Sequence, residues 1–404
     1  MKVVLIISLL ILSAFCKIEF VSELVRHGAR SPGVVYNFAK HPKQNFKRPM
    51  ELSAIGMRQH YLIGAEFRHR YIDEAKLISE KFNSTEIHLK STDTERTIDS
   101  GLSQMVGIFP PEVCQQTLSS WQQTHALPPM KIDGADKIIK KLKEKALPDC
   151  INLLPITSEK GQFSFDMQIG NVYCPPFKQV VQELTDSDEY KQMFKEVNDP
   201  MKARFTEFLQ REVEYEEIWD LCEYLTLADL HKIQLIFDYT EEDVQGCKKV
   251  HDVKYYTTAW GDERLWKYSA KVYLDNLVQS MDSIIAGNQT YKAELNFGHD
   301  DSLAYILNGL GNLTKETPEL ASTLFVELHS SEGKYFVRAF HDDVQMTFGL
   351  CEQLDCPYET FKKNIQQRVA PGTIEDACGT QEKESIIEEK SYVGVSKLIK
   401  REYA

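Results

Sequence analysis

Stretches rich in apolar residues that end at a polar cluster recur along this chain, and they predict strands followed by helices. Residues 18–25 form the first such stretch. Residues 87–91 and 293–297 alternate apolar and polar side chains, as half-buried strands do. Strands that alternate with helices are typical of an α/β domain.

The second and third of these strands run directly into predicted helices. Thr92-Asp93-Thr94-Glu95 matches a capping box. The helix it opens would carry, on one face, Ile98, Leu102, Met105, Val106 and Phe109. The next helix would begin at Asp300, ahead of Leu303, Ala304, Leu307 and Leu310. Because ligands of open α/β sheets bind at the carboxyl ends of strands, we expect the three junctions to meet at one edge of the sheet.

The last part of the chain predicts a return to the sheet. Residues 265–285 predict one long helix, which ends before Gly287. Residues 323–329 and 334–340 flank Ser330-Ser331-Glu332-Gly333 and predict a β-hairpin in the same sheet.

Residues 111–255 have a different sequence pattern, which predicts helices separated by breaks at Pro175-Pro176 and near Pro200. Apolar positions at helical spacing are Phe177, Val180, Val181, Leu184, Ile218, Leu221, Tyr224 and Leu225. A chain of 404 residues fits two domains better than one. We therefore predict an α/β domain, with a mixed sheet flanked by helices, over residues 17–110 and 256–404. A smaller, all-helical domain is inserted at residues 111–255.

The N-terminus predicts export from the cytosol. Met1 and Lys2 precede an apolar stretch from Val3 to Leu12, and small residues follow, which together predict a secretory signal peptide over residues 1–16. This stretch is too short to span a membrane, and the sequence has no second apolar run of spanning length. We expect a lumenal or secreted protein without a membrane anchor.

Cysteine usage favours the same compartment. Eight of the nine cysteines follow residue 16, and an even number suits an oxidising environment: Cys114, Cys150, Cys174, Cys222, Cys247, Cys351, Cys356 and Cys378. A Cys351–Cys356 bond would close a short local loop, although spacing alone leaves the connectivity open. Three acceptor sequons, at Asn83, Asn288 and Asn312, fit a glycosylated surface.

The charge balance argues against a nucleic acid or an anionic membrane as partner. The chain has 47 Lys and Arg against 60 Asp and Glu, a formal net charge of −13. Nucleic acids and anionic membranes select surfaces with an excess of Lys and Arg. A local arginine cluster can still bind a small phosphate, because at short range it outweighs a distant, screened net charge.

Such a cluster follows the first predicted strand, in Arg26-His27-Gly28-Ala29-Arg30-Ser31-Pro32. A histidine between two arginines is kept neutral at physiological pH, and guanidinium groups donate hydrogen bonds in the geometry that phosphate oxygens accept. Together these groups describe a histidine that attacks phosphorus.

This heptapeptide matches the signature of the histidine acid phosphatases. Residues 91–97, with Arg96, resemble the family segment whose arginine closes the phosphate cradle, and Asn296-Phe297-Gly298-His299-Asp300 resembles its histidine–aspartate pair. Residues 56–61 and 109–112 are similar to the prostatic and lysosomal acid phosphatase branch. The resemblance implies a phosphoglycerate mutase-like fold.

The resemblance also implies a role for each site residue. His27 would be the nucleophile and Asp300 the proton donor, and the phosphoryl oxygens would be bound by Arg26, Arg30, Arg96 and His299. The scheme needs neither a metal nor a cofactor. Because Asp300 must be protonated to donate while His27 must be neutral to attack, an acidic pH optimum is expected.

The family pattern extends to substrate preference and assembly. The inserted domain would overhang the phosphate pocket, so preference would depend on its loops and on residues 33–49, which contain Lys43, Lys47 and Arg48. A disulfide between Cys174 and Cys378 would follow the family, and a homodimer is possible because dimers are common in this branch.

These residues also have ordinary structural interpretations. Arg96 alone would be a solvated helix arginine, and His299-Asp300 could simply open a helix. Six histidines outside the motifs are expected to be structural or at the surface: His41, His60, His69, His88, His125 and His341.

We predict an acid phosphatase that hydrolyses small phosphate monoesters, either secreted or in the lysosomal lumen. One alternative is a phytase or inositol-polyphosphate phosphatase of the same superfamily, which the basic cluster from Lys43 to Arg48 weakly favours. Another is a non-catalytic phosphate-binding relative, which the presence of both His27 and Asp300 disfavours.

Overall fold

The computed structural model describes residues 16–110, 117–126, 128, 130, 135–147, 156–158, 167, 174–288, 291–373 and 376. Residues 1–15, which hold most of the predicted signal peptide, lie outside this part of the chain, as do Cys114, Cys150 and Cys378. Cys16 is an exposed free thiol. The signal peptide over residues 1–16 therefore stays a prediction.

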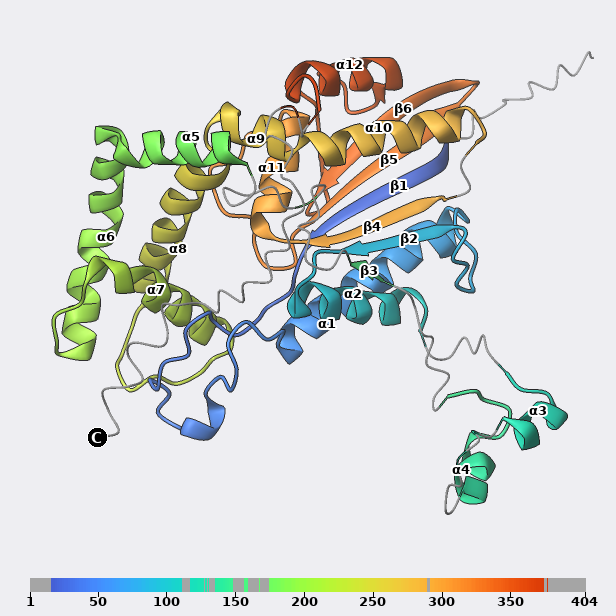
Figure 1. Cartoon of the computed structure of the whole chain (residues 1–404), viewed down its shortest axis with the longest axis horizontal. Helices are drawn as coiled ribbons and strands as arrows, with labels where there is room; N and C mark the ends of the chain where they lie inside the picture. Colours follow the sequence, from blue (N-terminus) through green and yellow to red (C-terminus); the bar gives the residue numbers. More distant parts are fainter. Residues whose placement is uncertain are drawn as a thin grey trace, which may run out of the picture.

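A mixed β-sheet forms the centre of the molecule and has eight strands within the described residues (Figure 1). The strands are β1 (Lys17–Arg26), β2 (Ile87–Ser91), β3 (Thr157–Ser158), β4 (Ala293–Gly298), β5 (Thr323–Ser331), β6 (Lys334–His341), β7 (Val344–Met346) and β8 (Cys356–Pro357). Their order is β3-β2-β4-β1-β5-β6-β7, and β8 pairs with β6. The pairs among β1 to β4 are parallel and the others antiparallel. The predicted mixed sheet and the β5–β6 hairpin are confirmed.

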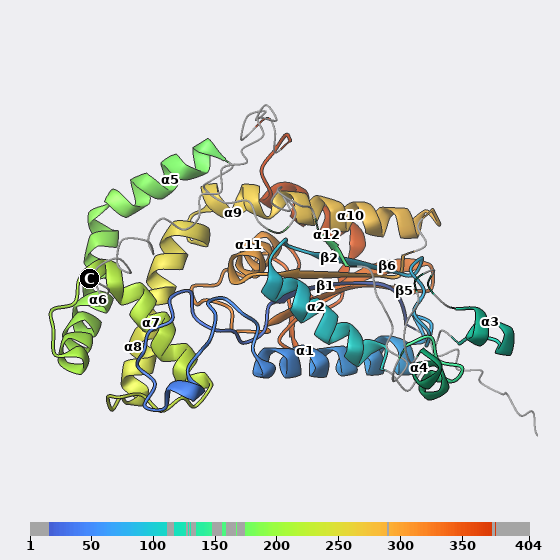
Figure 2. The same ribbon diagram turned by 60° about the horizontal axis from the view of Figure 1, so that its bottom comes forward.

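Helices cover both faces of this sheet (Figure 2). One face carries α1 (Ala54–Phe67) and α2 (Glu95–Ile108), and the other carries α9 (Glu263–Ser269), α10 (Lys271–Ile285), α11 (Asp300–Leu310) and α12 (Tyr358–Arg368). Alternate residues of β1 serve the two faces: Val21 and Val25 join the apolar cluster with α1 and α2, while Phe20 and Leu24 join the cluster with α10 and α11. Burial on both faces keeps the parallel strands in place, so the residues that follow their ends also have fixed positions.

Helix α2 begins differently from the sequence prediction. Its N-cap is Thr94, and among the described residues no side chain caps the helix there, so the predicted capping box is wrong. The hydroxyl of Thr92 has other partners, because its Oγ1 lies 2.9 Å from both Thr97 Oγ1 and His299 Nε2.

The buried face of α2 also differs from the prediction. Leu102 and Val106 are exposed, whereas Ser100 and Gln104 are fully buried. Small residues allow α1 and α2 to approach closely: a Cβ on Gly64 of α1 would lie 2.0 Å from the carbonyl oxygen of Gln104. The prediction followed hydrophobicity, but this helix contact selects for small and polar side chains.

The predicted long helix over residues 265–285 is two helices, because Ala270 separates α9 from α10. This junction packs on α11, where a Cβ on Gly309 would lie 2.9 Å from the Ala270 Cβ. The predicted break near Pro200 is wrong as well, since Pro200 lies inside α6 (Asp188–Leu209). Burial of Met201 and Phe205 in the surrounding core favours the helix despite its proline.

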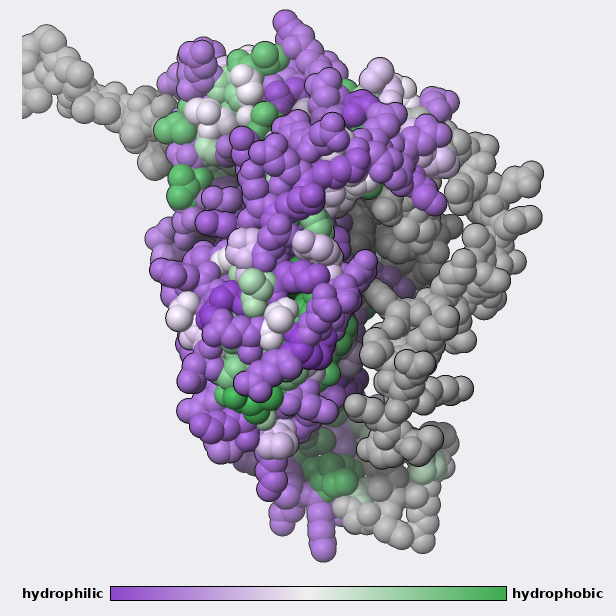
Figure 3. Space-filling view, turned by 90° about the vertical axis from the view of Figure 1, so that its left-hand side faces the viewer, coloured by the Kyte–Doolittle hydropathy of each residue, from purple (hydrophilic) through white to green (hydrophobic). Residues whose placement is uncertain are grey.

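A helical segment lies beside the sheet and consists of α5 (Pro175–Asp186), α6, α7 (Tyr215–Leu230) and α8 (Glu241–Tyr255) (Figure 1). Its core includes Phe205 and Leu225, and Ala39 from the loop after β1 joins them. A disulfide between Cys222 and Cys247 links α7 to α8. The face of the molecule on this side is mostly hydrophilic (Figure 3). Helices α3 (Ser120–His125) and α4 (Ala135–Leu142) lie at the opposite end of the molecule.

Short helical turns at Pro42–Gln44, Arg68–Glu74 and Tyr256–Trp260 complete the described helices. Cys351 and Cys356 form the predicted local disulfide. Cys174 is also disulfide-bonded, and its predicted partner Cys378 lies outside the described residues. The sequon residues Asn83, Asn288 and Asn312 are exposed. Across the described ranges, no helix combines the length and the apolar character needed to cross a bilayer.

Candidate active site

Three parallel strands end side by side and carry the predicted site residues. Arg26 of β1 pairs with Gly298 of β4, and Ser91 of β2 pairs with Phe297 of β4. His27, Thr92 and His299 follow these strand ends directly, and the His27 N–H donates to the Gly298 carbonyl at 3.0 Å. The structure thus brings the three junctions together at the carboxyl edge of the sheet.

The His27 ring is buried and held in one tautomer. Its Nδ1 lies 2.9 Å from the carbonyl oxygen of Gly28, which can only accept a hydrogen bond. Nδ1 therefore carries the proton, and Nε2 of the neutral ring keeps its lone pair. Burial, followed by the charges of Arg26 and Arg30, holds the pKa of His27 well below its ordinary value. The ring meets His299 edge-on, with centroids 5.6 Å apart.

His299 is the N-cap of α11 and lies between Arg96 and Thr92. Arg96, in the first turn of α2, donates to His299 Nδ1 at 3.3 Å, so the proton of the neutral ring is on Nε2. This Nε2 donates to Thr92 Oγ1 at 2.9 Å. Burial, with the charge of Arg96, lowers the pKa of His299 to about 3. The ring is therefore uncharged at any pH above that value.

Arg26 and Asp300 form an ion pair in which Arg26 Nη2 lies 2.7 Å from Asp300 Oδ2. Arg26 also donates to the carbonyl of Pro318. Burial alone would raise the pKa of Asp300, but the charges around it, above all that of Arg26, outweigh burial and leave this pKa below its ordinary value. The neighbouring Asp301 has its pKa raised to about 7 by burial and by the Asp300 charge. Asp300 is thus a carboxylate here, whereas the expected proton donor must be protonated.

Arg30 is held by Glu223, which comes from α7 of the helical segment. Arg30 Nη2 lies 2.7 Å from Glu223 Oε1, and Glu223 Oε2 accepts the Gly33 N–H at 2.6 Å. Burial opposes the charge of Glu223, but Arg30 keeps its pKa below the ordinary value. The sequence analysis missed Glu223. Its signal was a carboxylate inside the apolar run between Ile218 and Leu225.

The backbone after His27 is fixed by side chains of α1 and α2. The Gly28 N–H donates to Ser100 Oγ at 3.1 Å, and the Ala29 N–H donates to Gln59 Oε1 at 2.9 Å. A Cβ on Gly28 would lie 2.6 Å from the Cα of Gly56. A side chain at residue 28 would therefore push the loop away from α1 and displace the histidine.

A chain of buried polar side chains runs beside β1. Gln104 donates through Nε2 to both oxygens of Glu23, at 2.8 and 2.7 Å, and its Oε1 accepts from His60 Nδ1 at 3.1 Å. Burial raises the pKa of Glu23 to about 8 and lowers that of His60 to about 4. Both groups are therefore uncharged from about pH 4 to pH 8. The first apolar stretch holds two carboxylates, Glu19 and Glu23, and of these Glu23 is the fully buried one.

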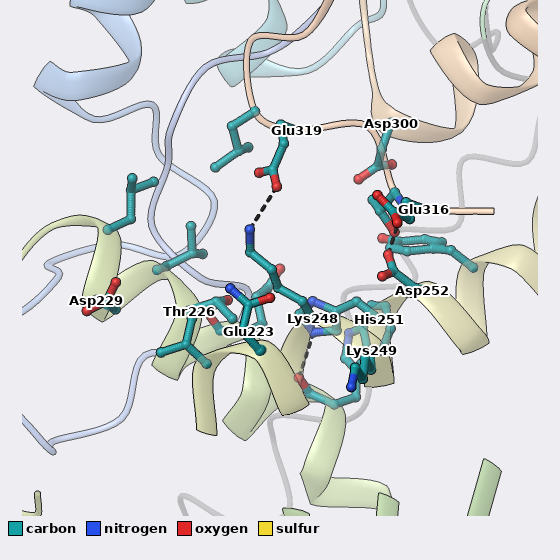
Figure 4. A pocket seen from close by; sticks show the side chains of 18 of the residues that line it. Glu223, Thr226, Asp229, Lys248, Lys249, His251, Asp252, Asp300, Glu316 and Glu319 are labelled. Atoms are coloured by element: carbon teal, nitrogen blue, oxygen red, sulfur yellow. Dashed lines mark hydrogen bonds and ion pairs between the residues drawn. The ribbon is translucent and has the colours of Figure 1, made fainter. Parts of the chain in front are cut away.

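A cavity of about 450 Å³ extends from the cluster of Arg26, Arg30 and Asp300, which we call the phosphate cradle, toward the helical segment (Figure 4). Arg26, Arg30 and Asp300 line one end of it. Side chains of α7, α8 and the loop 316–320 line the rest. Lys248 of α8 reaches across to Glu319 of that loop, with 2.8 Å between the charged atoms.

The basic cluster from Lys43 to Arg48 does not contribute to this cavity. Within the described residues, Lys43, Lys47 and Arg48 are absent from its lining, and Arg48 pairs with Glu51 and Glu95 instead. The expectation that these cations shape the pocket is therefore wrong. In the described part of the chain, no group of three or more His, Cys, Asp or Glu side chains is placed to hold a metal ion.

The sequence pattern of the histidine phosphatase superfamily (branch 2) matches residues 47–342. The match spans more than half of the chain. It begins after His27, so the motif from Arg26 to Pro32 is an observation separate from it.

Individual relatives are similar over most of the chain. Prostatic acid phosphatase of Bos taurus is 22% identical over 337 residues, which cover 80% of this chain and 77% of that protein. Lysosomal acid phosphatase of Xenopus laevis is 23% identical over 418 residues, which cover 98% and 86%. The solved structure of the phytase from Citrobacter braakii matches with a TM-score of 0.62 at 13% identity, covering 88% of this chain and 98% of that one. At such low identity this likeness shows the fold alone.

Proposed function

The chain belongs to branch 2 of the histidine phosphatase superfamily and is a phosphatase enzyme acting on small phosphate esters; from this premise we propose that it is an acid phosphatase working through a phosphohistidine at His27. The observation that carries the proposal is the tautomer of His27. Its proton is committed to the Gly28 carbonyl, so Nε2 is left with a lone pair among cationic groups. A neutral imidazole in a cationic cradle is suited to attack a phosphoryl group.

The reaction would proceed in two balanced steps. His27 Nε2 attacks phosphorus, the bond from phosphorus to the ester oxygen breaks, and the departing oxygen takes a proton from Asp300. Water then attacks the phosphohistidine, the Asp300 carboxylate takes a proton from it, and inorganic phosphate leaves with His27 restored. One carboxyl group thus serves first as acid and then as base.

Arg26, Arg30, Arg96 and His299 would bind the phosphoryl oxygens. For His299 this requires that the Nε2–H leave Thr92 Oγ1 when phosphate binds. The Nε atoms of Arg26 and Arg30 are buried and have no hydrogen-bond partner among the described residues. Guanidinium groups beside a bound phosphoryl group stabilise the charge that develops on its oxygens. In the free enzyme, Asp300 and Glu223 balance part of this positive charge.

The low pKa of Asp300 in the free enzyme can be reconciled with the acid role. A phosphate dianion that draws Arg26 away from Asp300 removes the main charge that lowers this pKa and adds a negative charge nearby, so the pKa rises in the complex. His27 stays neutral to low pH, because its pKa is far below the ordinary value. Activity should therefore persist at acidic pH and fall as Asp300 loses its proton in the complex.

We also propose that the protein acts outside the cytosol, either secreted or in the lysosomal lumen. The disulfides Cys222–Cys247 and Cys351–Cys356 support an oxidising compartment. The relatives named prostatic and lysosomal acid phosphatase support the same assignment.

Hydrolysis of an aryl phosphate by the purified chain from acidic to neutral pH, with and without a chelator, tests the proposal. We expect activity that resists the chelator and is highest at acidic pH. Absence of turnover while phosphate still binds would contradict the proposal and favour a non-catalytic binding protein.

A further inference from the structure

The cavity changes its charge with distance from the phosphate cradle. Beyond Arg26, Arg30 and Asp300, its lining holds two lysines, Lys248 and Lys249. Against these stand five carboxylates, which we call the acidic wall: Asp229, Glu241, Asp252, Glu316 and Glu319. His251 also lines the cavity, but burial lowers its pKa, so it adds little positive charge. The wall that would face the leaving group therefore has a negative excess.

Several carboxylates of the acidic wall are not neutralised by cations. Asp252 accepts the backbone N–H of Thr317 at 2.8 Å, and Glu241 accepts from the amide of Gln245 at 2.8 Å, so both donors are uncharged. Within the described ranges, neither of these carboxylates nor Glu316 makes an ion pair. Figure 4 shows Asp252 and Glu316 close together below Asp300. Lys248 is already paired with Glu319.

Aromatic rings complete this part of the cavity. Trp219 and Tyr255 belong to its lining. The ammonium group of Lys254 lies 3.9 Å from the centroid of the Trp219 ring, so one ring of this wall already holds a cation. Carboxylates combined with aromatic faces are the chemistry by which proteins recognise ammonium groups.

Two observations support the binding of a ligand in this cavity. It is continuous with Arg26 and Arg30, which are only 9% and 7% exposed and keep an unpartnered Nε within the described residues. A phosphoryl group bound there would point its ester substituent along the acidic wall.

From this arrangement we infer that the enzyme prefers monoesters whose leaving alcohol carries a positive charge, such as an aminoalkyl phosphate. The inference rests on the proposed function, because it assigns the leaving group of that same reaction. The acidic wall would attract an ammonium group and repel further phosphates, so an inositol polyphosphate is disfavoured.

The test compares kcat/KM for aminoalkyl phosphates of increasing chain length with n-alkyl phosphates of matched length. We expect the ammonium ester to be favoured by about threefold to tenfold at low salt, and the advantage to shrink as salt is added. Asp252→Asn and Glu316→Gln together should lower this ratio by about threefold. Glu316 is exposed, so Glu316→Gln alone tests the idea without endangering the fold.

Glu242→Gln is the matched control, because Glu242 is an exposed carboxylate of α8 outside the cavity lining. It should leave both the ratio and the activity unchanged. Equal or reversed preference between the paired esters would overturn the inference, and so would a preference that the wall variants and salt leave intact. Failure to hydrolyse either ester would instead contradict the proposed function.

Discussion

The two ends of the cavity differ in charge and in the elements that form them. The phosphate end, at Arg26 and Arg30, is cationic, is fixed by three strand ends and carries its functional groups on short, buried loops. The far end is acidic, belongs mainly to α7, α8 and the loop 316–320, and is more exposed to solvent. The strand ends would therefore set the reaction, and the helical segment would set which ester fits. Variants at the two ends should therefore change different kinetic constants.

The largest effect is expected at the phosphate end, from His27→Ala. Removing the nucleophile should lower kcat by about 10⁴-fold or more, while inorganic phosphate still binds to the remaining arginines. Steady-state kinetics and phosphate inhibition measure the two effects. His41→Ala, at an exposed histidine, is the control. Substantial turnover by His27→Ala would show that the assigned nucleophile is wrong.

Asp300→Asn should have the next largest effect, and its size should depend on the leaving group. We expect a loss of roughly 10²- to 10³-fold for alkyl phosphates, whose alkoxide needs a proton, and a smaller loss for nitrophenyl phosphate. The comparison of kcat for the two substrates is the measurement. Equal losses for both would remove Asp300 from the acid role.

Glu223→Gln tests the point at which the two ends meet. The variant keeps an oxygen for the Gly33 N–H but leaves Arg30 without its charged partner, so the guanidinium group loses its fixed position. We expect KM and the phosphate inhibition constant to rise by roughly tenfold, with a smaller change in kcat. Glu216→Gln, at an exposed position of the same helix, should have no effect. Unchanged constants in Glu223→Gln would show that the helical segment does not position Arg30.

The smallest effect on turnover is expected from Glu23→Gln, which acts on stability. The folded-state pKa of about 8 is above the ordinary value of 4.5, so the folded protein retains a proton that the unfolded chain has lost between these pH values. This stabilisation is complete below about pH 4.5 and is lost as the pH rises toward 8. Glu23→Gln should flatten that decline by a few kcal/mol.

Thermal unfolding of Glu23→Gln and of wild type between pH 5 and pH 8 measures how the stability of each protein changes with pH. Identical pH dependence in the two proteins would show that Glu23 is not protonated when folded. Glu242→Gln provides a control for the loss of one carboxylate at the surface.

Sequence patterns predicted the strands and the helix that carry the site, because each site motif directly follows an apolar stretch. The strands that end just before His27, Thr92 and His299 follow from apolar stretches, and the helix that begins at Asp300 follows from apolar spacing. The buried face of α2 could not be predicted, because its contact with α1 favours small side chains such as Gly107 over Val106. Division of the chain into domains at residues 111 and 255 stays a prediction.

The acidic wall lay beyond sequence reasoning for a different reason. Its carboxylates come from two helices and a loop that are distant in sequence, and no local pattern distinguishes Asp252 or Glu316 from other solvated acids. The cluster from Lys43 to Arg48 shows the converse error, because proximity to the nucleophile in sequence did not place it in the cavity. The packing of the helical segment against the sheet brings the carboxylates of the acidic wall together in one cavity.

The central claim is that the phosphate end forms a covalent intermediate on His27. Turnover of several aryl and alkyl phosphates in the presence of an added alcohol tests it directly, because the alcohol and water compete for whatever species carries the phosphoryl group. One common phosphohistidine predicts the same ratio of transferred to hydrolysed phosphate for every leaving group. A ratio that varies with the leaving group would contradict the account.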